Sequence, residues 1–257
     1  MAGRKLPTEF KKSIPDPEMT QYSILSTKKL IPSLTQHLVK QGIACKEEEL
    51  IRIEPVLNGE TLETVLPLTY EPGTAVVFTS RNAVEIVAAV LHANEDLDAA
   101  PAHWQIFSLA GSTRDAVIEL FDNLPTGEVY TGALLAETII AAGDIHRVVF
   151  FCSNQRRDEL PDTLSEHGIE VHEVITYETI ETPVTVQEAI DGVLFFSPSA
   201  VSSFFSANRL PSSTVCFAIG NTTAKAITAH TNNKVIISLT PDQQSMLSQV
   251  QEYFIKK

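Results

Sequence analysis

Short apolar runs that alternate with helical stretches constrain the fold of this 257-residue chain more than any other feature. The runs are rich in valine, isoleucine and phenylalanine, which suits strands of a parallel sheet covered on both faces, and we therefore predict an α/β fold. The expected strands are Tyr22–Ser26, Ala75–Thr79, Ile106–Leu109, Arg147–Cys152, Gly192–Ser197, Thr214–Ile219 and Lys234–Ser238. Helices are expected near Lys29–Gln41, Arg81–His92, Thr113–Phe121, Leu134–Ala142, Gln155–His167, Ala200–Ala207, Thr222–His230 and Gln243–Phe254.

Two segments depart from this rhythm. Cys45–Pro55 and Ile169–Glu181 alternate polar and apolar side chains over a length that exceeds a usual strand of a compact lobe. Alternation of this kind indicates a half-solvated pair, so we expect the two segments to pair as a β ladder. The chain then crosses into a second lobe after the first segment and returns along the second.

The predicted fold is α/β, with two Rossmann-like (flavodoxin-like) parallel-sheet lobes joined by a two-stranded β ladder and a cleft between them. The expected divisions are a mobile N-terminal extension at 1–20, a discontinuous first lobe at 21–45 and 182–257, the ladder at 46–59 and 169–181, and a second lobe at 60–168.

A weak internal repeat supports two related lobes. The segment Val77–Val84 resembles Phe195–Val201 around a shared Phe-x-Ser core, and Phe107–Thr113 resembles Phe217–Thr223. In each case an apolar strand leads into a small polar turn and then a helix. Because such units recur in every α/β fold, the repeat alone is only suggestive of two related lobes.

Composition excludes several classes of partner. A formal net charge of −13 argues against nucleic acid, which selects clustered lysine and arginine. No apolar run approaches the roughly 20 residues that span a bilayer, and the N-terminal residues lack the apolar core of a signal peptide. The odd count of three cysteines fits a reducing compartment, the cytosol or an equivalent organelle matrix. Since no strand edge or helix face is conspicuously apolar, we expect a monomer without membrane contact.

Small polar turns follow the predicted strands, at the sheet edge where ligands bind in open parallel sheets. Helix N-termini there favour anions through free backbone N–H groups and the helix dipole. Capping explains any one turn alone, but five together, two with glycine, favour an anion-binding cleft. The candidate residues are Thr79, Ser80, Gly111, Ser112, Thr113, Ser153, Asn154, Ser197, Pro198, Ser199, Gly220, Thr222 and Thr223.

No nucleotide, zinc or hydrolase motif is present, and we expect no metal site. Cys152 ends an apolar strand with no neighbouring base in sequence, which favours a buried thiol over a nucleophile. Tyr177 on the second ladder segment is either a packing residue or a site residue. Arg156 and Arg157 begin an expected helix, where the dipole disfavours cations; they indicate either an anionic ligand or a solvated pair.

In four short blocks the chain resembles the uroporphyrinogen-III synthase family, over about residues 22–254. The blocks stand in the family's order and are Phe78–Ser80, Ser153–Leu160 with Gly168 and Val174–Tyr177, Phe195–Val201, and Ala218–Ala226. Two positions differ from the family's pattern. Lys28 stands where an arginine often follows the first strand, and Arg114 stands where a threonine is common.

The resemblance implies a hinged two-lobe enzyme that cyclises the linear tetrapyrrole hydroxymethylbilane to uroporphyrinogen III, inverting ring D and losing water, without a cofactor. It implies that Tyr177 assists departure of the hydroxide. The carboxylates of the substrate would be held, largely through backbone amides, by Thr79, Ser80, Ser153, Asn154, Ser197, Ser199, Thr222 and Thr223. Two alternatives stay open: a tetrapyrrole- or anion-binding protein without chemistry, and an interaction protein that docks through the acidic ladder.

Overall fold

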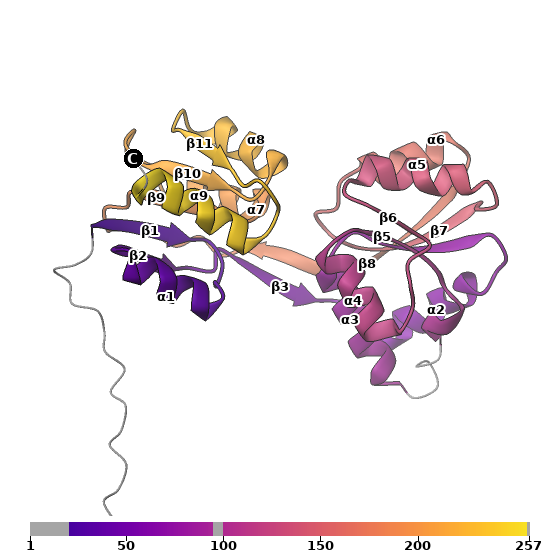
Figure 1. The fold of residues 1–257 in the computed structure, drawn as a ribbon. Coiled ribbons are helices and arrows are strands. Elements are labelled where there is room, and N and C mark those ends of the chain that lie inside the picture. Colours follow the sequence, from indigo (N-terminus) through magenta and orange to yellow (C-terminus); the bar gives the residue numbers. More distant parts are fainter. Residues whose placement is uncertain (1–20, 95–99, 256–257) are drawn as a thin grey trace, which may run out of the picture. The chain divides into compact units, whose positions relative to one another are not determined.

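The structure is a computed structural model that describes residues 21–94 and 100–255. The expected extension at 1–20 lies outside the described residues. The chain forms two compact units (Figure 1), and each has the predicted α/β architecture with parallel strands. Unit 1 contains the described residues up to Arg52 and from Glu181 onward, and unit 2 is Ile53–Ile180.

Unit 1 is built on a five-stranded sheet of order β11-β10-β9-β1-β2, paired in parallel throughout. Its strands are β1 (Tyr22–Ser26), β2 (Ile43–Glu47), β9 (Gly192–Phe195), β10 (Val215–Ala218) and β11 (Val235–Ile237). Its helices are α1 (Pro32–Lys40), α7 (Pro198–Ala207), α8 (Asn221–His230) and α9 (Gln243–Ile255). One face packs against α1 and α9 through Leu38 and Val250, and the other against α7 and α8 through Phe204 and Ile227.

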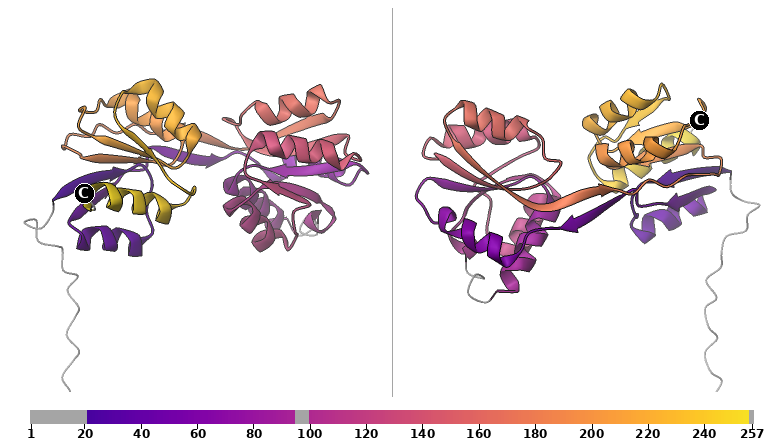
Figure 2. Two further views of the ribbon diagram at one scale, coloured as in Figure 1. Left: turned by 45° about the horizontal axis from the view of Figure 1, so that its top comes forward. Right: turned by 180° about the vertical axis from the view of Figure 1, so that it is seen from behind.

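Unit 2 is built on a six-stranded sheet of order β3-β8-β7-β4-β5-β6. Its strands are β3 (Ile51–Pro55), β4 (Thr74–Phe78), β5 (Gln105–Leu109), β6 (Gly127–Val129), β7 (Arg147–Ser153) and β8 (Glu170–Glu181). Its helices are α2 (Gly59–Thr69), α3 (Arg81–His92), α4 (Ser112–Phe121), α5 (Gly132–Ala142) and α6 (Glu159–Glu166), with a 3₁₀ turn η3 (Ala100–His103). The helices α2, α3 and α4 cover one face, while α5 and α6 cover the other (Figure 2).

The two sheets share one topology. In unit 1 the strands, numbered in chain order within the unit, run 2-1-3-4-5, which is the flavodoxin-like order. In unit 2 the order β8-β7-β4-β5-β6 becomes the same when β7 is counted first. Unit 2 is therefore a circular permutation of the topology of unit 1, which gives the internal sequence repeat a structural basis.

The expected strand Cys45–Pro55 is wrong as a single element. Its first residues belong to β2, which pairs in parallel with β1 in unit 1. Its last residues form β3, the neighbour of β8 at the edge of the six-stranded sheet. The segment Glu48–Leu50 separates the two, and Leu50 turns a fully buried side chain into the core of unit 1. A long alternating pattern thus conceals two strands of different sheets.

Two elements of unit 2 have no counterpart in the expected set. The helix α2 contains Pro67 close to its end, a residue that signals a break rather than a helix. The strand β6 has only three residues, Gly-Glu-Val, and is too short for an alternating pattern. Among the described residues, no helix is long and apolar enough to cross a membrane.

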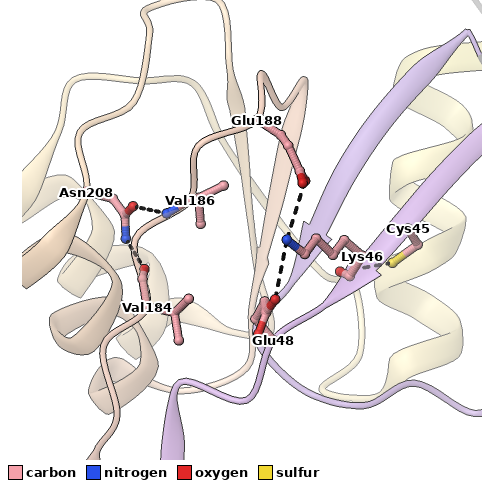
Figure 3. Close-up of polar contacts among 7 residues, drawn as sticks. All are labelled: Cys45, Lys46, Glu48, Val184, Val186, Glu188 and Asn208. Carbon is pink, nitrogen blue, oxygen red and sulfur yellow. Dashed lines mark hydrogen bonds and ion pairs between the residues drawn. The ribbon is translucent and has the colours of Figure 1, made fainter.

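The segment that leads from β8 back to β9 is fixed to the body of unit 1 by Asn208 (Figure 3). The Val186 N–H donates to Asn208 Oδ1, and Asn208 Nδ2 donates to the Val184 carbonyl, both over 2.8 Å. Closer to β9 in the same segment, Glu188 pairs with Lys46 of β2. The Lys46 Nζ lies 3.4 Å from both Glu188 Oε2 and Glu48 Oε1. Because Asn208 is buried and the ion pairs are exposed, the amide is the stronger of the two anchors.

Candidate functional site

The topology of each unit has a switch point at the carboxyl edge of its sheet, where neighbouring strands lead to helices on opposite faces. We call this position the crevice of the unit, because ligands bind at such points in open parallel sheets. In unit 2 it is the boundary of β7 and β4. Ser153 ends β7, while Thr79 and Ser80 follow β4, so three predicted site residues flank this boundary. In unit 1 the corresponding boundary lies between β1 and β9, where Thr27 and Ser197 follow the strands.

Ser80 is the best-defined polar group of the unit 2 crevice. Its Oγ is the N-cap of α3 and accepts the Ala83 N–H over 3.2 Å. The same oxygen accepts the hydroxyl of Tyr177 over 3.0 Å. A serine hydroxyl has two acceptor sites and one proton, so both acceptor sites are used and the O–H remains to donate. The half-buried Ser80 is thereby set to donate a hydrogen bond to an anion.

Tyr177 approaches this crevice from β8, two strands away from β4. Its ring is 7% exposed and belongs to the core cluster under α2, α3 and α4, together with Phe78 and Phe151. The packing interpretation of Tyr177 is therefore confirmed, and its site role stays a prediction that is compatible with the packing, because the buried ring carries its hydroxyl to Ser80.

The helices α4 and α8 begin in a different way. Each follows its strand through a glycine, Gly111 or Gly220, and among the described residues no side chain caps either N-terminus. A Cβ placed on either glycine meets no described atom within 4 Å. Ser112 and Thr222 in these first turns are exposed, whereas Thr113 and Thr223 are buried. The first-turn N–H groups are thus accessible, and such groups bind carboxylates or phosphates.

The repeated motifs serve the same local roles in both units. Ser197 caps α7 by accepting the Ala200 N–H over 3.1 Å, as Ser80 caps α3. Gly111 and Gly220 occupy equivalent N-cap positions of α4 and α8. Pro198 is the first residue of α7, and Ser199 follows it in the same turn.

At the unit 1 crevice the sequence analysis missed Thr27. Its N–H and its hydroxyl both donate to the Leu194 carbonyl, over 3.0 and 2.8 Å, which ties the carboxyl end of β1 to β9. Thr27 follows Ser26 at the end of β1, a hydroxyl pair like Thr79 and Ser80 after β4, and this similarity is the signal that could have found it.

The expected helix start after Ser153 and Asn154 is wrong. The helix α6 begins only at Glu159, so neither Arg156 nor Arg157 lies in a helical first turn and the argument from the dipole does not apply to them. Arg156 instead forms ion pairs with Asp158 and Glu173.

The turn between β7 and α6 is held by polar contacts to β8. Asn154 Oδ1 accepts the Thr179 N–H over 2.9 Å, and Ser153 Oγ accepts the Gln155 N–H over 3.2 Å. The Ser153 hydroxyl still has its proton to donate. The side-chain carbonyl of Asn154 is already occupied, because it accepts a hydrogen bond from β8.

Cationic side chains near the turns of unit 2 are largely neutralised. Arg81 pairs with Glu85 and Glu119, and Arg114 pairs with Glu128 and Asp115. At the same edge of unit 1, Lys28 and Lys225 are exposed, and within residues 21–94 and 100–255 their ammonium groups form no ion pair. Unit 1 therefore offers more unpaired positive charge to an anion.

The thiols are unsuited to nucleophilic chemistry. Burial raises the pKa of the Cys152 thiol to about 12, with a further contribution from Glu173, and burial raises that of Cys216 to about 12. The buried-thiol interpretation of Cys152 is confirmed. Within the described part of the chain, no group of three or more His, Cys, Asp or Glu side chains is placed to hold a metal ion.

A shallow cavity of 360 Å³ lies elsewhere, between β11 and the end of α9. Lys234 sits over the ring of Tyr253 there, 4.5 Å from its centroid. Lys234 precedes β11 and so lies at the amino edge of the sheet, opposite the turns described above. The cavity brings together none of the predicted site residues.

Comparison with known proteins identifies the family. The family model described as "Uroporphyrinogen-III synthase HemD" matches residues 32–248, most of the chain. The chain belongs to the uroporphyrinogen-III synthase family. It is 31% identical over 159 residues to the uroporphyrinogen-III synthase of Saccharomyces cerevisiae, an alignment that covers 52% of this chain. The alignment spans 58% of the yeast protein, little more than half of that relative's length.

Solved structures of uroporphyrinogen-III synthases share the fold of this chain. A mutant of the Thermus thermophilus enzyme aligns with a TM-score of 0.66 and 15% identity, over 90% of this chain and 97% of that one. The enzyme of Helicobacter pylori aligns with a TM-score of 0.65 and 16% identity, over 91% of this chain and 100% of that one. At such identities the likeness concerns the fold, and the predicted family resemblance itself is confirmed by the family model.

Proposed function

We propose that this protein is a uroporphyrinogen-III synthase, a cyclising lyase that converts hydroxymethylbilane to uroporphyrinogen III with inversion of ring D and loss of water. The membership of residues 32–248 in the family carries the proposal. The hydrogen bond from Tyr177 to Ser80 at the unit 2 crevice supports it, because it brings the predicted catalytic hydroxyl to the predicted binding turns.

The substrate is a flexible polycarboxylate, and the turns offer donors rather than many cations. We propose that its acetate and propionate groups bind the free N–H groups of the α4 and α8 first turns and the hydroxyl of Ser80. Lys28 and Lys225 add positive charge at the unit 1 edge. The net charge of −13 is a weak obstacle, since the Debye length is about 8 Å at physiological salt and distant acids are screened.

The chemistry requires the hydroxymethyl C–O bond to break and the departing hydroxide to take up a proton and leave as water. The resulting azafulvene cation closes through a spiro intermediate, and a proton is released as the neutral product forms. The bilane closes by itself to the symmetric isomer, so the task of the protein is mainly to fold the substrate and direct closure. In the free protein the single Tyr177 proton is donated to Ser80 Oγ, and we propose that Tyr177 redirects it to the leaving hydroxyl when the substrate binds. Because its phenol lies against Ser80, a bound carboxylate and the leaving group meet at one hydrogen-bonded pair.

The finer assignments belong to the same proposal. We propose that the enzyme works as a monomer in the cytosol, without a metal or organic cofactor. The three free cysteines, two of them buried, fit a reducing compartment.

Incubation of the purified protein with enzymatically generated hydroxymethylbilane, followed by separation of isomers I and III, tests the function. The proposal expects isomer III in excess over the non-enzymatic isomer I. A protein that binds the bilane but yields only isomer I would be the binding module without chemistry.

A further inference from the structure

A register shift in β8 determines where the Tyr177 side chain points. Cys152 of β7 pairs with Ile175, whereas the next residue, Ser153, pairs with Tyr177, so Thr176 is an extra residue in β8. In a regular strand, alternate residues share a face, and Val174 and Tyr177 would lie on opposite faces. With the extra residue they share one, and both pack in the cluster under α2, α3 and α4. The β-bulge thus turns Tyr177 towards Ser80.

Thr176 itself holds this bulge. A bulge leaves the extra residue out of the regular ladder. Here the fully buried Thr176 hydroxyl donates to the Cys152 carbonyl over 2.9 Å, a side-chain bond at the point where the register changes. The Thr176 carbonyl accepts the N–H groups of Val56 and Leu57, over 3.0 and 3.1 Å. Both sides of the bulge are therefore fixed, and beyond it the ladder resumes with Asn154 N–H donating to the Tyr177 carbonyl.

We infer that Thr176 is a positioning residue of the synthase reaction, which acts by fixing the bulge that aims the Tyr177 phenol at Ser80. The inference rests on the proposed function for its catalytic part. Its structural part, that the Thr176 hydroxyl sets the direction of Tyr177, stands on the contacts alone. Valine keeps the shape of threonine and removes only the donor, so Thr176→Val isolates the hydroxyl.

The kinetic test compares the wild type with Thr176→Val, Thr176→Ser, Tyr177→Phe and the double variant Thr176→Val/Tyr177→Phe. Misaiming the phenol should lower kcat about tenfold in Thr176→Val and leave KM within about twofold. Serine restores the donor and should return kcat to within about twofold of wild type. In the Tyr177→Phe background, Thr176→Val should cause no further loss, because its effect passes through the phenol.

Thr214→Val is the matched control. The buried Thr214 hydroxyl also donates to a backbone carbonyl, that of Ile190 in the segment before β9, over 2.8 Å, but at the amino edge of unit 1. It should leave kcat and isomer ratio unchanged. Should Thr176→Val fail to fold, as judged by circular dichroism, Thr176→Ala replaces it in each comparison.

Fluorine NMR of protein labelled with 3-fluorotyrosine separates the two parts. The Tyr177 signal is the one missing in Tyr177→Phe, and Thr176→Val should shift this signal alone among the five tyrosines. If the wild type forms no isomer III, the proposed function fails while the NMR result still judges the positioning role. An unmoved Tyr177 signal, or an equal loss of kcat from Thr176→Val with and without the phenol, would overturn the inference.

Discussion

The hydroxyl of Tyr177 donates to Ser80 Oγ over 3.0 Å, although 97 residues separate the two in sequence. Ser80 is the N-cap of α3, and Tyr177 stands beyond a bulge in β8, so one hydrogen bond links a helix N-terminus to a strand two places away in the sheet. The bond leaves the Ser80 proton free for a ligand. The proposed binding group and the proposed acid are thereby joined by one hydrogen bond.

Tyr177→Phe should lower turnover clearly but leave measurable activity. The phenylalanine keeps the buried ring and removes only the hydroxyl, so orientation of the substrate by the other turns persists. Initial rates of isomer III formation check this, with thermal unfolding to confirm that the fold is retained. Unchanged rates would remove Tyr177 from the mechanism.

Ser80→Ala should cost about 1 kcal/mol of stability through the lost cap and should also raise KM. Asn58→Ala is the matched control, since Asn58 Oδ1 caps α2 of the same unit by accepting the Thr61 N–H over 2.9 Å. The control should lose similar stability with kinetics unchanged. Urea denaturation and steady-state rates measure both. Equal kinetic effects of the two variants would show that only the loss of a cap matters.

Gly220→Asp should move stability and affinity in opposite directions. The backbone of Gly220 is extended, at φ −174°, and accommodates any residue, and aspartate is a preferred N-cap. Its carboxylate should therefore cap α8 and stabilise the protein by a few tenths of a kcal/mol. It should also occupy the proposed anion site and raise KM about tenfold, as expected for about 1.5 kcal/mol of lost charge-assisted hydrogen bonding. Gly220→Asn, a neutral cap, should raise KM less; equal values would argue against carboxylate binding at α8.

Asn208→Ala should destabilise the protein by about 2 kcal/mol. The substitution leaves the Val186 N–H and the Val184 carbonyl without their buried partner. Lys46→Gln, which removes only exposed ion pairs to Glu48 and Glu188, should change the free energy of unfolding much less. Urea unfolding measures the free energy of unfolding of the two variants. A larger loss for Lys46→Gln would contradict the conclusion that Asn208 is the stronger anchor of the segment between β8 and β9.

The cysteines should be unreactive in the native protein near neutral pH. Burial raises the pKa of Cys152 and Cys216 to about 12, above the ordinary value of 9.0, so the nucleophilic thiolate is scarce. Between pH 9 and 12 the unfolded chain releases these protons and the folded chain retains them, so stability falls as pH rises through that window. Thiol titration with and without denaturant measures the reactivity. The free energy of unfolding above pH 9, compared between the wild type and Cys152→Ala, measures the effect on stability. Rapid native labelling of Cys152 would contradict them.

The sequence predicted the α/β class and most of the helix positions, because buried parallel strands and amphipathic helices leave direct patterns. The helix α3, for example, begins at Arg81 and ends at His92 as expected. The internal repeat correctly indicated equivalent turns, with Ser80 and Ser197 as caps and Gly111 and Gly220 at the two open N-termini. Local chemistry sufficed for these features.

Features that depend on tertiary pairing were not predictable. The alternation of Cys45–Pro55 fits one long strand equally well, and only packing of Leu50 in unit 1 divides it into two. The start of α6 at Glu159 follows a turn in which Asn154 Oδ1 accepts the Thr179 N–H of the adjacent strand. The bulge at Thr176 likewise arises from pairing between strands, and no residue pattern announces it.

Amide chemical shifts of ¹⁵N-labelled protein, titrated with uroporphyrinogen III under reducing conditions, test the central claim most directly. The account predicts that the largest changes fall on the N–H groups of Arg81–Ala83, Ser112–Arg114 and Asn221–Thr223, at the carboxyl edges of the sheets. Changes concentrated instead around Lys234 and Tyr253, at the cavity beside β11, would contradict it.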